Sequence, residues 1–298
     1  METTIYSSLI NITNEQFAIH KNSNIFCKDK SLNFSNETNL QISLLRNNLK
    51  EMSMKEIEQL SKHYRNTFVK CFCNVNQYSH FTKKEEEDIE KIYQYLLSDL
   101  MCLDKSLKDV EQAHYQRINT FIKSTNIHIY QLNHNHDELA KNFICEQYSA
   151  SFLKKLLNLE IIDIQEPILD IGCGQDGKLV QYLQEQGLNA YGFDRFAQAN
   201  HIYKGDWFTF SYGQKKWGLI ISNLSFSSHF LYHHNHRELI ANHYAKTYMK
   251  ILLSLKNGGM WIYAPSIPFF EELLPEEQYK IKRIKIHEDF SKTTIIKL

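Results

Sequence analysis

Three closely spaced glycines are the residues of this sequence best suited to forming a ligand site. Gly172, Gly174 and Gly177 follow the apolar run 168–171 with the spacing G-x-G-x-x-G. Glycine lets the chain turn sharply and brings backbone N–H groups within hydrogen-bonding distance of a ligand, where a Cβ atom would obstruct them. Residues 178–186 continue with apolar side chains at helical intervals. The pattern predicts a buried strand, a ligand-binding turn and a helix.

An acidic residue beside this turn narrows the choice of ligand. Asp170 lies two positions before Gly172. A dinucleotide would bring a pyrophosphate to such a turn, and a carboxylate there would repel it. A ligand with positive charge, such as the ammonium group of an amino acid, suits Asp170 better. A nicotinamide-dependent oxidoreductase stays open as an alternative, because it would share the glycines and an acidic residue at Asp194.

The segment 169–174, Leu-Asp-Ile-Gly-Cys-Gly, resembles the first motif of the class I S-adenosylmethionine-dependent methyltransferases. Four later segments resemble further motifs in family order, namely 189–194, 204–207, 217–223 and 255–264. The resemblance covers residues 136–298 and implies S-adenosyl-L-methionine as cofactor. It implies that Asp194 binds the ribose hydroxyls and that Asp206 contacts the adenine amino group beside an aromatic neighbour. The cofactor-binding residues that it implies are Asp170, Gly172, Cys173, Gly174, Gly177, Asp194, Arg195, Gly205, Asp206, Trp207 and Asn223.

The same resemblance implies an α/β fold, a Rossmann-like seven-stranded sheet with helices on both faces. Residues 217–223 and 255–264 are expected to be its fourth and fifth strands. After them the sequence predicts a helix over 269–279 despite Pro275, an alternating strand over 281–286 and a final strand over 293–298. The last two would complete the sheet, with an antiparallel member at its edge.

The first 166 residues contain neither glycine nor proline, whereas all ten glycines and all four prolines follow. This distribution predicts an all-helical N-terminal domain over 1–135. Its helices are expected over 37–60, broken near Ser53, over 82–101 behind a capping box of Thr82 and Glu85, and over 107–122. Residues 1–35 are either a loosely ordered arm or short helices. A further helix over 137–157 is expected to lead into the first strand, with Tyr148 either in the core or at the cofactor.

The acceptor of the methyl group is expected after the fourth strand, because ligands bind at the carboxyl ends of parallel strands. Asn223-Leu224-Ser225-Phe226 has the outline of the N-P-P-Y/F motif of amino-group methyltransferases with both prolines replaced. In that motif the asparagine accepts a hydrogen bond from the amine and the aromatic ring stacks on it. The alternative is a strand-four loop without such chemistry.

Histidines follow this loop closely. His229 is the candidate general base, since histidine titrates near neutral pH, and it joins Asn223 as a candidate catalytic residue. Phe226, Tyr232 and His233 are candidate substrate-binding residues. Two other interpretations are a helix with partly solvated histidines and a metal site of His229, His233 and Glu238. Cys71 and Cys73, near His63 and His80, fit no common zinc pattern, so we predict no metal.

The overall composition favours a cytoplasmic enzyme. The 34 basic and 34 acidic residues balance, which gives no electrostatic reason to expect nucleic acid or an anionic membrane as partner. The sequence shows no signal peptide and no apolar run long enough to span a membrane, and the scattered cysteines suit reduced thiols. The sequence thus predicts a methyltransferase acting on a nitrogen or oxygen of a small molecule or peptide. A catalytically silent binding module of the same fold remains an alternative.

Overall fold

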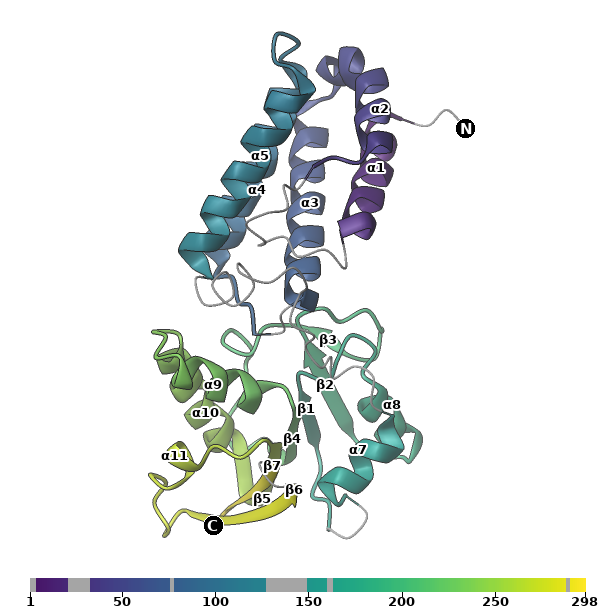
Figure 1. The fold of residues 1–298 in the computed structure, drawn as a ribbon. Helices are drawn as coiled ribbons and strands as arrows, with labels where there is room; N and C mark the ends of the chain where they lie inside the picture. The colour runs from purple at the N-terminus through teal and green to yellow at the C-terminus, as the bar shows by residue number, and fades with distance from the viewer. Residues whose placement is uncertain (1–3, 21–32, 76–77, 127–148, 160–162, 288–289) are drawn as a thin grey trace. The chain divides into compact units, whose positions relative to one another are not determined.

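The computed structural model describes residues 4–20, 33–75, 78–126, 149–159, 163–287 and 290–298 (Figure 1). The chain divides into two compact units, residues 1–143 and 144–298. The predicted boundary between residues 135 and 136, the start of the helix predicted over 137–157, and Tyr148 lie outside the described residues.

The first unit is helical, as the absence of glycine and proline predicts. Figure 1 shows α3, α4 and α5 running side by side, and α3 packs on α4 as α4 does on α5. The described part of residues 1–35 contains a helix, which favours the second of the two predicted alternatives there. The elements of this unit are α1 (Ile5–His20), α2 (Asn36–Leu45), the 3-10 helix η1 (Arg46–Glu51), α3 (Met54–Val75), α4 (Lys83–Met101) and α5 (Leu107–Thr125).

Side-chain caps place the helix starts in this unit. The break predicted near Ser53 is confirmed: the Ser53 N–H and hydroxyl both donate to Glu56 Oε2, at 2.8 and 2.7 Å, just before α3. The capping box before α4 is also confirmed. The Thr82 N–H donates to Glu85 Oε2 at 2.6 Å, and the Glu85 N–H donates to Thr82 Oγ1 at 3.3 Å. Such caps satisfy N–H groups that have no partner inside the helix.

The second unit is a seven-stranded sheet in the order β3-β2-β1-β4-β5-β7-β6, which confirms the predicted fold class. Strands β1 to β5 run parallel along this order, and β7 is antiparallel to both β5 and β6. The strands are β1 (Ile168–Ile171), β2 (Ala190–Asp194), β3 (Tyr203–Lys204), β4 (Trp217–Asn223), β5 (Leu255–Ala264), β6 (Tyr279–His287) and β7 (Phe290–Lys297).

Helices cover both faces of this sheet. In Figure 1, α7 (Ala150–Leu157) and α8 (Lys178–Glu185) lie on one side, and α9 (Phe226–Asn235) and α10 (Ala241–Ser254) on the other. Each side has its own apolar core. Leu157, Leu179 and Val180 pack with Ile168 on the first side, whereas the second core is rich in aromatic rings.

Two predictions for the end of the chain need correction. The helix predicted over 269–279 is only the short α11 (Pro268–Glu271), because Pro275 has no N–H for a continuing helix and disfavours helical geometry at Leu274. The antiparallel strand is not at the edge, since β7 lies between β5 and β6.

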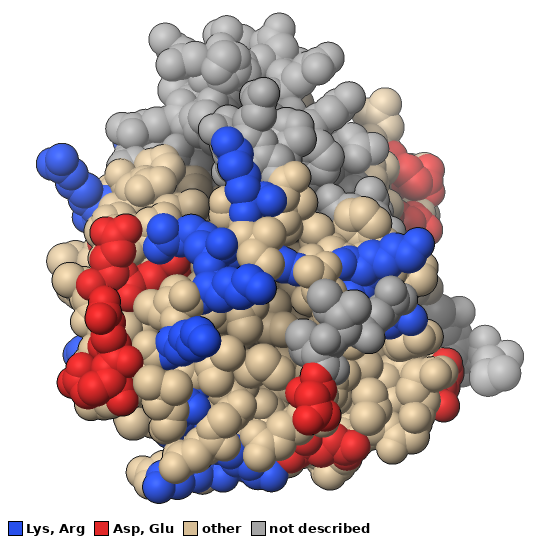
Figure 2. All heavy atoms as spheres, turned by 90° about the horizontal axis from the view of Figure 1, so that it is seen from below, with Lys and Arg blue, Asp and Glu red and all other residues tan. Residues whose placement is uncertain are grey.

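Basic residues alternate with isoleucines along β6, in the order Lys280-Ile281-Lys282-Arg283-Ile284-Lys285. Lys280, Lys282, Arg283 and Lys285 are exposed on the edge strand of the sheet. Figure 2, seen from below, shows Lys and Arg side chains sharing this face of the molecule with Asp and Glu. Exposed lysines on an edge strand oppose pairing with another chain, so the alternation needs no ligand to explain it.

Candidate active site

The turn after β1 needs its glycines. Gly172, Gly174 and Gly177 have φ angles of 69°, 77° and 56°, in the left-handed region that favours glycine. A Cβ atom at Gly172 would lie 2.7 Å from the Ser225 Cβ, and one at Gly177 would lie 2.5 Å from the Ile202 Cγ2. The turn is therefore closed on two sides by its neighbours, which hold its backbone geometry.

Asp194, at the end of β2, is tied to this turn. Its Oδ2 accepts a hydrogen bond from the Gly174 N–H at 3.2 Å, and its Oδ1 accepts one from the Phe196 N–H at 2.8 Å. Burial raises the pKa of this carboxyl, whereas the Phe196 N–H and the nearby Arg195 charge oppose the shift. The structure thus brings together the ends of β1 and β2 as the motifs predict.

Asp170 is the most buried carboxylate of this group, with 5% of its surface exposed. It lies in β1 between Gly192 of β2 and Ile221 of β4. Burial, and next the Asp194 charge, raise the pKa of Asp170 to about 7. A cationic ligand near this carboxylate would lower that pKa again, because an opposite charge favours the ionised form.

Cys173 and Arg195 flank the two carboxylates. Burial and then the Asp170 and Asp194 charges raise the pKa of the Cys173 thiol, so it stays protonated and is a poor nucleophile. The Arg195 guanidinium carbon lies 4.9 Å from the centre of the Phe196 ring. Cys173 therefore lines the turn as a neutral side chain, and Arg195 supplies a positive charge beside it.

Gly205, Asp206 and Trp207 follow β3. The Gly205 N–H donates to the Asp194 carbonyl at 3.1 Å, and Asp206 Oδ1 accepts from the Phe208 N–H at 2.8 Å. Burial raises the pKa of Asp206. The Trp207 ring is 9% exposed and lies 4.8 Å from the His229 ring, measured between ring centres. Trp207 thus packs toward α9, and only a small part of it is open to a ligand.

The loop after β4 has an unusual backbone. Leu224 has a φ of 50°, and Ser225, the residue before α9, has φ −115° and ψ −101°. Proline is locked near φ −65° and could adopt neither conformation. This backbone therefore requires residues other than proline at positions 224 and 225. The loop differs in conformation from an N-P-P-Y/F motif, and not only in its two replaced prolines. Non-glycine residues at positive φ often occur at functional sites.

Asn223 ends β4 with a buried polar atom. Its side-chain Oδ1 is buried and has no hydrogen-bond partner among the described residues. Leaving a buried acceptor unsatisfied costs roughly 1–3 kcal/mol. A ligand carrying an N–H or O–H group could satisfy it.

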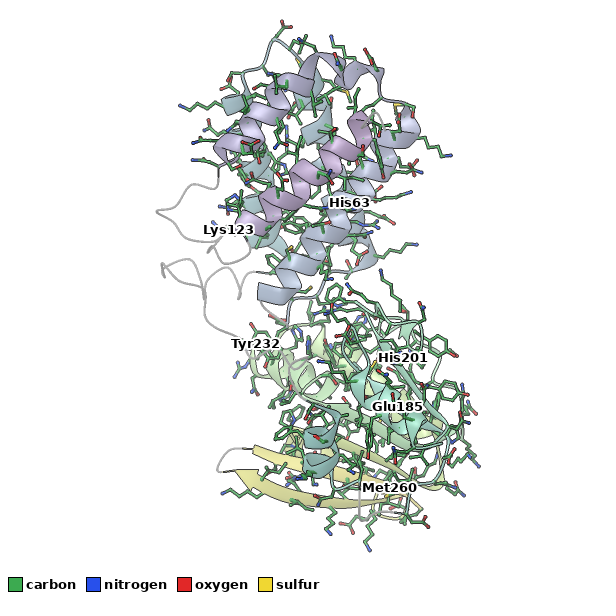
Figure 3. All side chains as sticks on the ribbon, turned by 90° about the vertical axis from the view of Figure 1, so that its right-hand side faces the viewer. His63, Lys123, Glu185, His201, Tyr232 and Met260 are labelled. Atoms are coloured by element: carbon green, nitrogen blue, oxygen red, sulfur yellow. The ribbon has the colours of Figure 1, made fainter. Side chains whose placement is uncertain are left out.

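The candidate residues on α9 fall into two groups. His229 and His233 are 5% and 4% exposed, and Phe226 is 0% exposed, so the Phe226 ring packs in the core. Tyr232 is half-buried and lies against His236, with 4.1 Å between ring centres. In Figure 3 the labels of Tyr232 and of His201, whose ring contacts Gly177, lie on opposite flanks of this unit. The structure thus brings His229 close to Trp207, whereas Tyr232 contacts His233 and His236.

Sequence reasoning missed two residues of this region. Ser225 Oγ donates to the Ile171 carbonyl at 2.7 Å and lies 2.9 Å from Ser222 Oγ, joining the loop after β4 to the turn after β1. Tyr244 of α10 has its hydroxyl 3.5 Å from His229 Nδ1 and its ring next to Trp207. The local sequence does not predict either contact, because each joins residues that are distant in the chain.

No three His, Cys, Asp or Glu side chains of the described residues gather so that they could hold a metal ion. No helix in the described part of the chain is long and apolar enough to cross a membrane.

The strand order, with β7 as the antiparallel member, defines the Rossmann-like class I methyltransferase fold. No protein-family model matches the chain, and no curated protein matches it. Solved structures similar to about half of the chain include a putative S-adenosylmethionine-dependent methyltransferase from Listeria monocytogenes, with 13% identity over 50% of this chain and 100% of that one and a TM-score of 0.36. An rRNA methylase from Streptococcus thermophilus has 15% identity over 51% of this chain and 98% of that one, with a TM-score of 0.34. The glycopeptide N-methyltransferase MtfA, solved with S-adenosylhomocysteine, has 12% identity over 53% of this chain and 94% of that one, with a TM-score of 0.32.

Proposed function

We propose that this protein is an S-adenosylmethionine-dependent methyltransferase whose acceptor is a nitrogen or oxygen atom of a small molecule or peptide. The observation that carries the proposal is the pair Asp170 and Asp194 near the ends of β1 and β2, beside the glycine turn whose Gly174 N–H donates to Asp194. A buried carboxylate beside a second one is costly unless the ligand is cationic. S-adenosylmethionine carries two positive groups, a sulfonium and an ammonium, and so fits this site.

Each carboxylate has a proposed role toward the cofactor. Asp194 would accept hydrogen bonds from the ribose hydroxyls, and Asp206 would contact the adenine amino group. Asp170 supplies the negative charge that favours a cationic ligand. The cofactor itself supplies an activated methyl group, so the protein needs mainly to hold the acceptor in line and to exclude water.

Asn223 and His229 are the residues proposed to act on the acceptor. Asn223 Oδ1 is placed to accept a hydrogen bond from an N–H or O–H group, since it is buried and without a partner in the described structure. His229 is proposed as the general base when the acceptor must lose a proton. Its packing against Trp207 places it beside the residues that follow β3.

The proposal is tested by calorimetric titration of the full chain with S-adenosylhomocysteine and, separately, with NAD⁺ and NADH. We expect binding of S-adenosylhomocysteine and none of either dinucleotide. The reverse result would favour an oxidoreductase. Binding of S-adenosylhomocysteine, together with no methyl transfer from S-adenosylmethionine to any of a broad set of amines, phenols and peptides, would favour a silent binding module.

We also propose that residues 136–298 form the methyltransferase domain and that the helical region 1–135 is a separate domain. The two compact units support the division. A fragment of residues 134–298 should bind S-adenosylhomocysteine with the affinity of the full chain, measured by calorimetry. A fragment that folds by circular dichroism and fails to bind would refute this division.

A further inference from the structure

His233 has one ring nitrogen engaged and the other buried without a partner. Its Nδ1 pairs with Glu238 Oε2, and the Glu238 N–H donates to the His233 carbonyl at 3.0 Å, which holds the carboxylate beside the ring. His233 Nε2 is buried and has no hydrogen-bond partner in the described part of the chain. The Glu238 contact makes Nδ1 the proton-carrying nitrogen, since a carboxylate accepts and cannot donate when ionised. In the neutral ring, Nε2 is then a buried acceptor.

The surroundings of this nitrogen are aromatic. The Tyr244 ring stacks on the His233 ring with 5.3 Å between centres and 21° between planes, and the Tyr232 ring stands perpendicular to it at 5.3 Å. Leaving an acceptor unsatisfied in such surroundings costs roughly 1–3 kcal/mol. Most buried polar groups in proteins have a hydrogen-bond partner, and a bound ligand is one way to supply it.

Position connects His233 to the proposed acceptor site. His229 and His233 are one helical turn apart on the buried side of α9, with 6.4 Å between ring centres. Tyr244 contacts both rings and interacts electrostatically with Arg195 and Asp206 as well as with Glu238. The charged and titratable groups around His233 are therefore Glu238 from the turn after α9, His229 and Tyr232 from α9, and Tyr244 from α10.

We infer that His233 Nε2, oriented by Glu238, is a specificity-determining contact that selects an acceptor with a second N–H or O–H group, about one helical turn from the atom that is methylated. This inference rests on the proposed function. It narrows the acceptor to a molecule with two polar groups separated by roughly the His229 to His233 spacing, and it gives Glu238 the role of a positioning residue.

The test uses the full chain saturated with S-adenosylhomocysteine, with benzyl alcohol and toluene as probes that differ by one hydroxyl group. Benzyl alcohol offers an O–H group and toluene does not. A neutral hydrogen bond is worth about 0.5–1.5 kcal/mol, so benzyl alcohol should bind about two- to tenfold more tightly than toluene. His233→Leu should abolish this preference while leaving S-adenosylhomocysteine affinity unchanged. His243→Gln, an exposed histidine of α10, is the matched control and should keep the preference.

Histidine side-chain NMR gives a readout that does not depend on the probes. Nitrogen-15 spectra should show His233 with its proton on Nδ1, and Nε2 should shift on addition of benzyl alcohol but not toluene. Glu238→Ala, which keeps the ring, should release this tautomer and reduce the preference for benzyl alcohol.

Three results would overturn the inference: a proton on Nε2 in the unaltered protein, equal binding of the two probes, or an unchanged preference in a folded His233→Leu protein. Failure of S-adenosylhomocysteine to bind would instead overturn the proposed function, so the two failures are distinguishable.

Discussion

Ser225 Oγ donates a 2.7 Å hydrogen bond to the carbonyl of Ile171 and so joins the loop after β4 to the end of β1. The two segments are 54 residues apart in the chain, and the contact is buried. It couples the turn proposed to hold the cofactor to the residue proposed to hold the acceptor, because Asn223 and Ser225 belong to the same loop. The Ser225 hydroxyl thus links the position of the glycine turn to the position of Asn223.

Ser225→Ala should therefore lower both stability and ligand affinity. Removing the hydroxyl leaves the buried Ile171 carbonyl without this donor, a loss of about 1–3 kcal/mol in the free energy of unfolding. S-adenosylhomocysteine affinity should fall at the same time, measured by calorimetry. Ser222→Ala is the matched control, because it leaves the bond to Ile171 in place and should cost less. Equal effects of the two substitutions would show that the Ile171 contact is not the important one.

The raised pKa of Asp170 predicts that cofactor affinity depends on pH. Its pKa in the free protein is raised to about 7 by burial and by Asp194, and a cationic ligand favours the ionised form. Affinity for S-adenosylhomocysteine, whose ammonium group stays protonated, should therefore rise as pH increases toward 7 and level off above it. Calorimetry between about pH 5.5 and 8.5 would measure this. Asp170→Asn should bind weakly with a flat profile over that range, and a wild-type profile that stays flat would contradict the role of Asp170.

The raised pKa of Asp170 makes the stability of the ligand-free protein change with pH in the opposite direction to cofactor affinity. Because the folded-state pKa of Asp170 is raised above the unfolded value, the folded state binds more protons between those two values. Stability should fall as pH rises from about 4 to about 7 and then become independent of this group. Urea denaturation of the wild type and of Asp170→Asn, compared across this range, isolates the contribution, which should disappear in the variant.

Asp194→Ala should remove most cofactor affinity. Charge-assisted hydrogen bonds are worth roughly 1.5–3 kcal/mol each, so the loss of those proposed to the ribose hydroxyls should weaken S-adenosylhomocysteine binding by about tenfold or more. The substitution also removes the acceptor for the Gly174 N–H, so circular dichroism must show that the fold survives. Binding that is unchanged in a folded variant would refute the proposed role.

Asn223→Ala and His229→Ala should affect chemistry more than cofactor binding. If His229 is the base, single-turnover kinetics with an acceptor should slow by about 10²- to 10⁴-fold. Asn223→Ala should slow turnover and also weaken acceptor binding. Cofactor affinity should stay nearly constant in both. A loss of cofactor affinity with normal chemistry would place these residues on the cofactor side of the methyl group.

Replacing Glu271 should lower the stability of the fold. Glu271 is 1% exposed, and its two oxygens accept hydrogen bonds from Tyr263, Thr293, the Ile267 N–H and, through two nitrogens, Arg283. Removing Glu271 leaves the Tyr263 and Thr293 hydroxyls and the Ile267 N–H without this acceptor, and each such loss in the interior costs about 1–3 kcal/mol. Glu271→Ala should therefore lower the unfolding free energy by this order, measured in urea. Glu272→Ala, whose side chain is 70% exposed at the next position, should change stability little.

The sequence by itself determined the order of the elements and the residues of the glycine turn after β1. Glycine and proline usage separated a helical region from an α/β region, because each residue type acts locally on the backbone. The glycines at 172, 174 and 177 could be identified for the same reason: their φ angles depend on the residue itself. The capping box at Thr82 and Glu85 was predictable because its two hydrogen bonds span only three residues.

Only the tertiary structure decided which side chains meet. It enclosed Phe226 in the core, joined Ser225 to Ile171, and placed Tyr244 beside both His229 and His233. It also showed that the backbone at Leu224 and Ser225 excludes proline. Such relationships join segments far apart in the chain, and their geometry follows from how helices pack on the sheet. Local residue patterns carry no record of that packing, so a sequence can name the histidines of α9 but not that His233 Nε2 has no partner among the described residues.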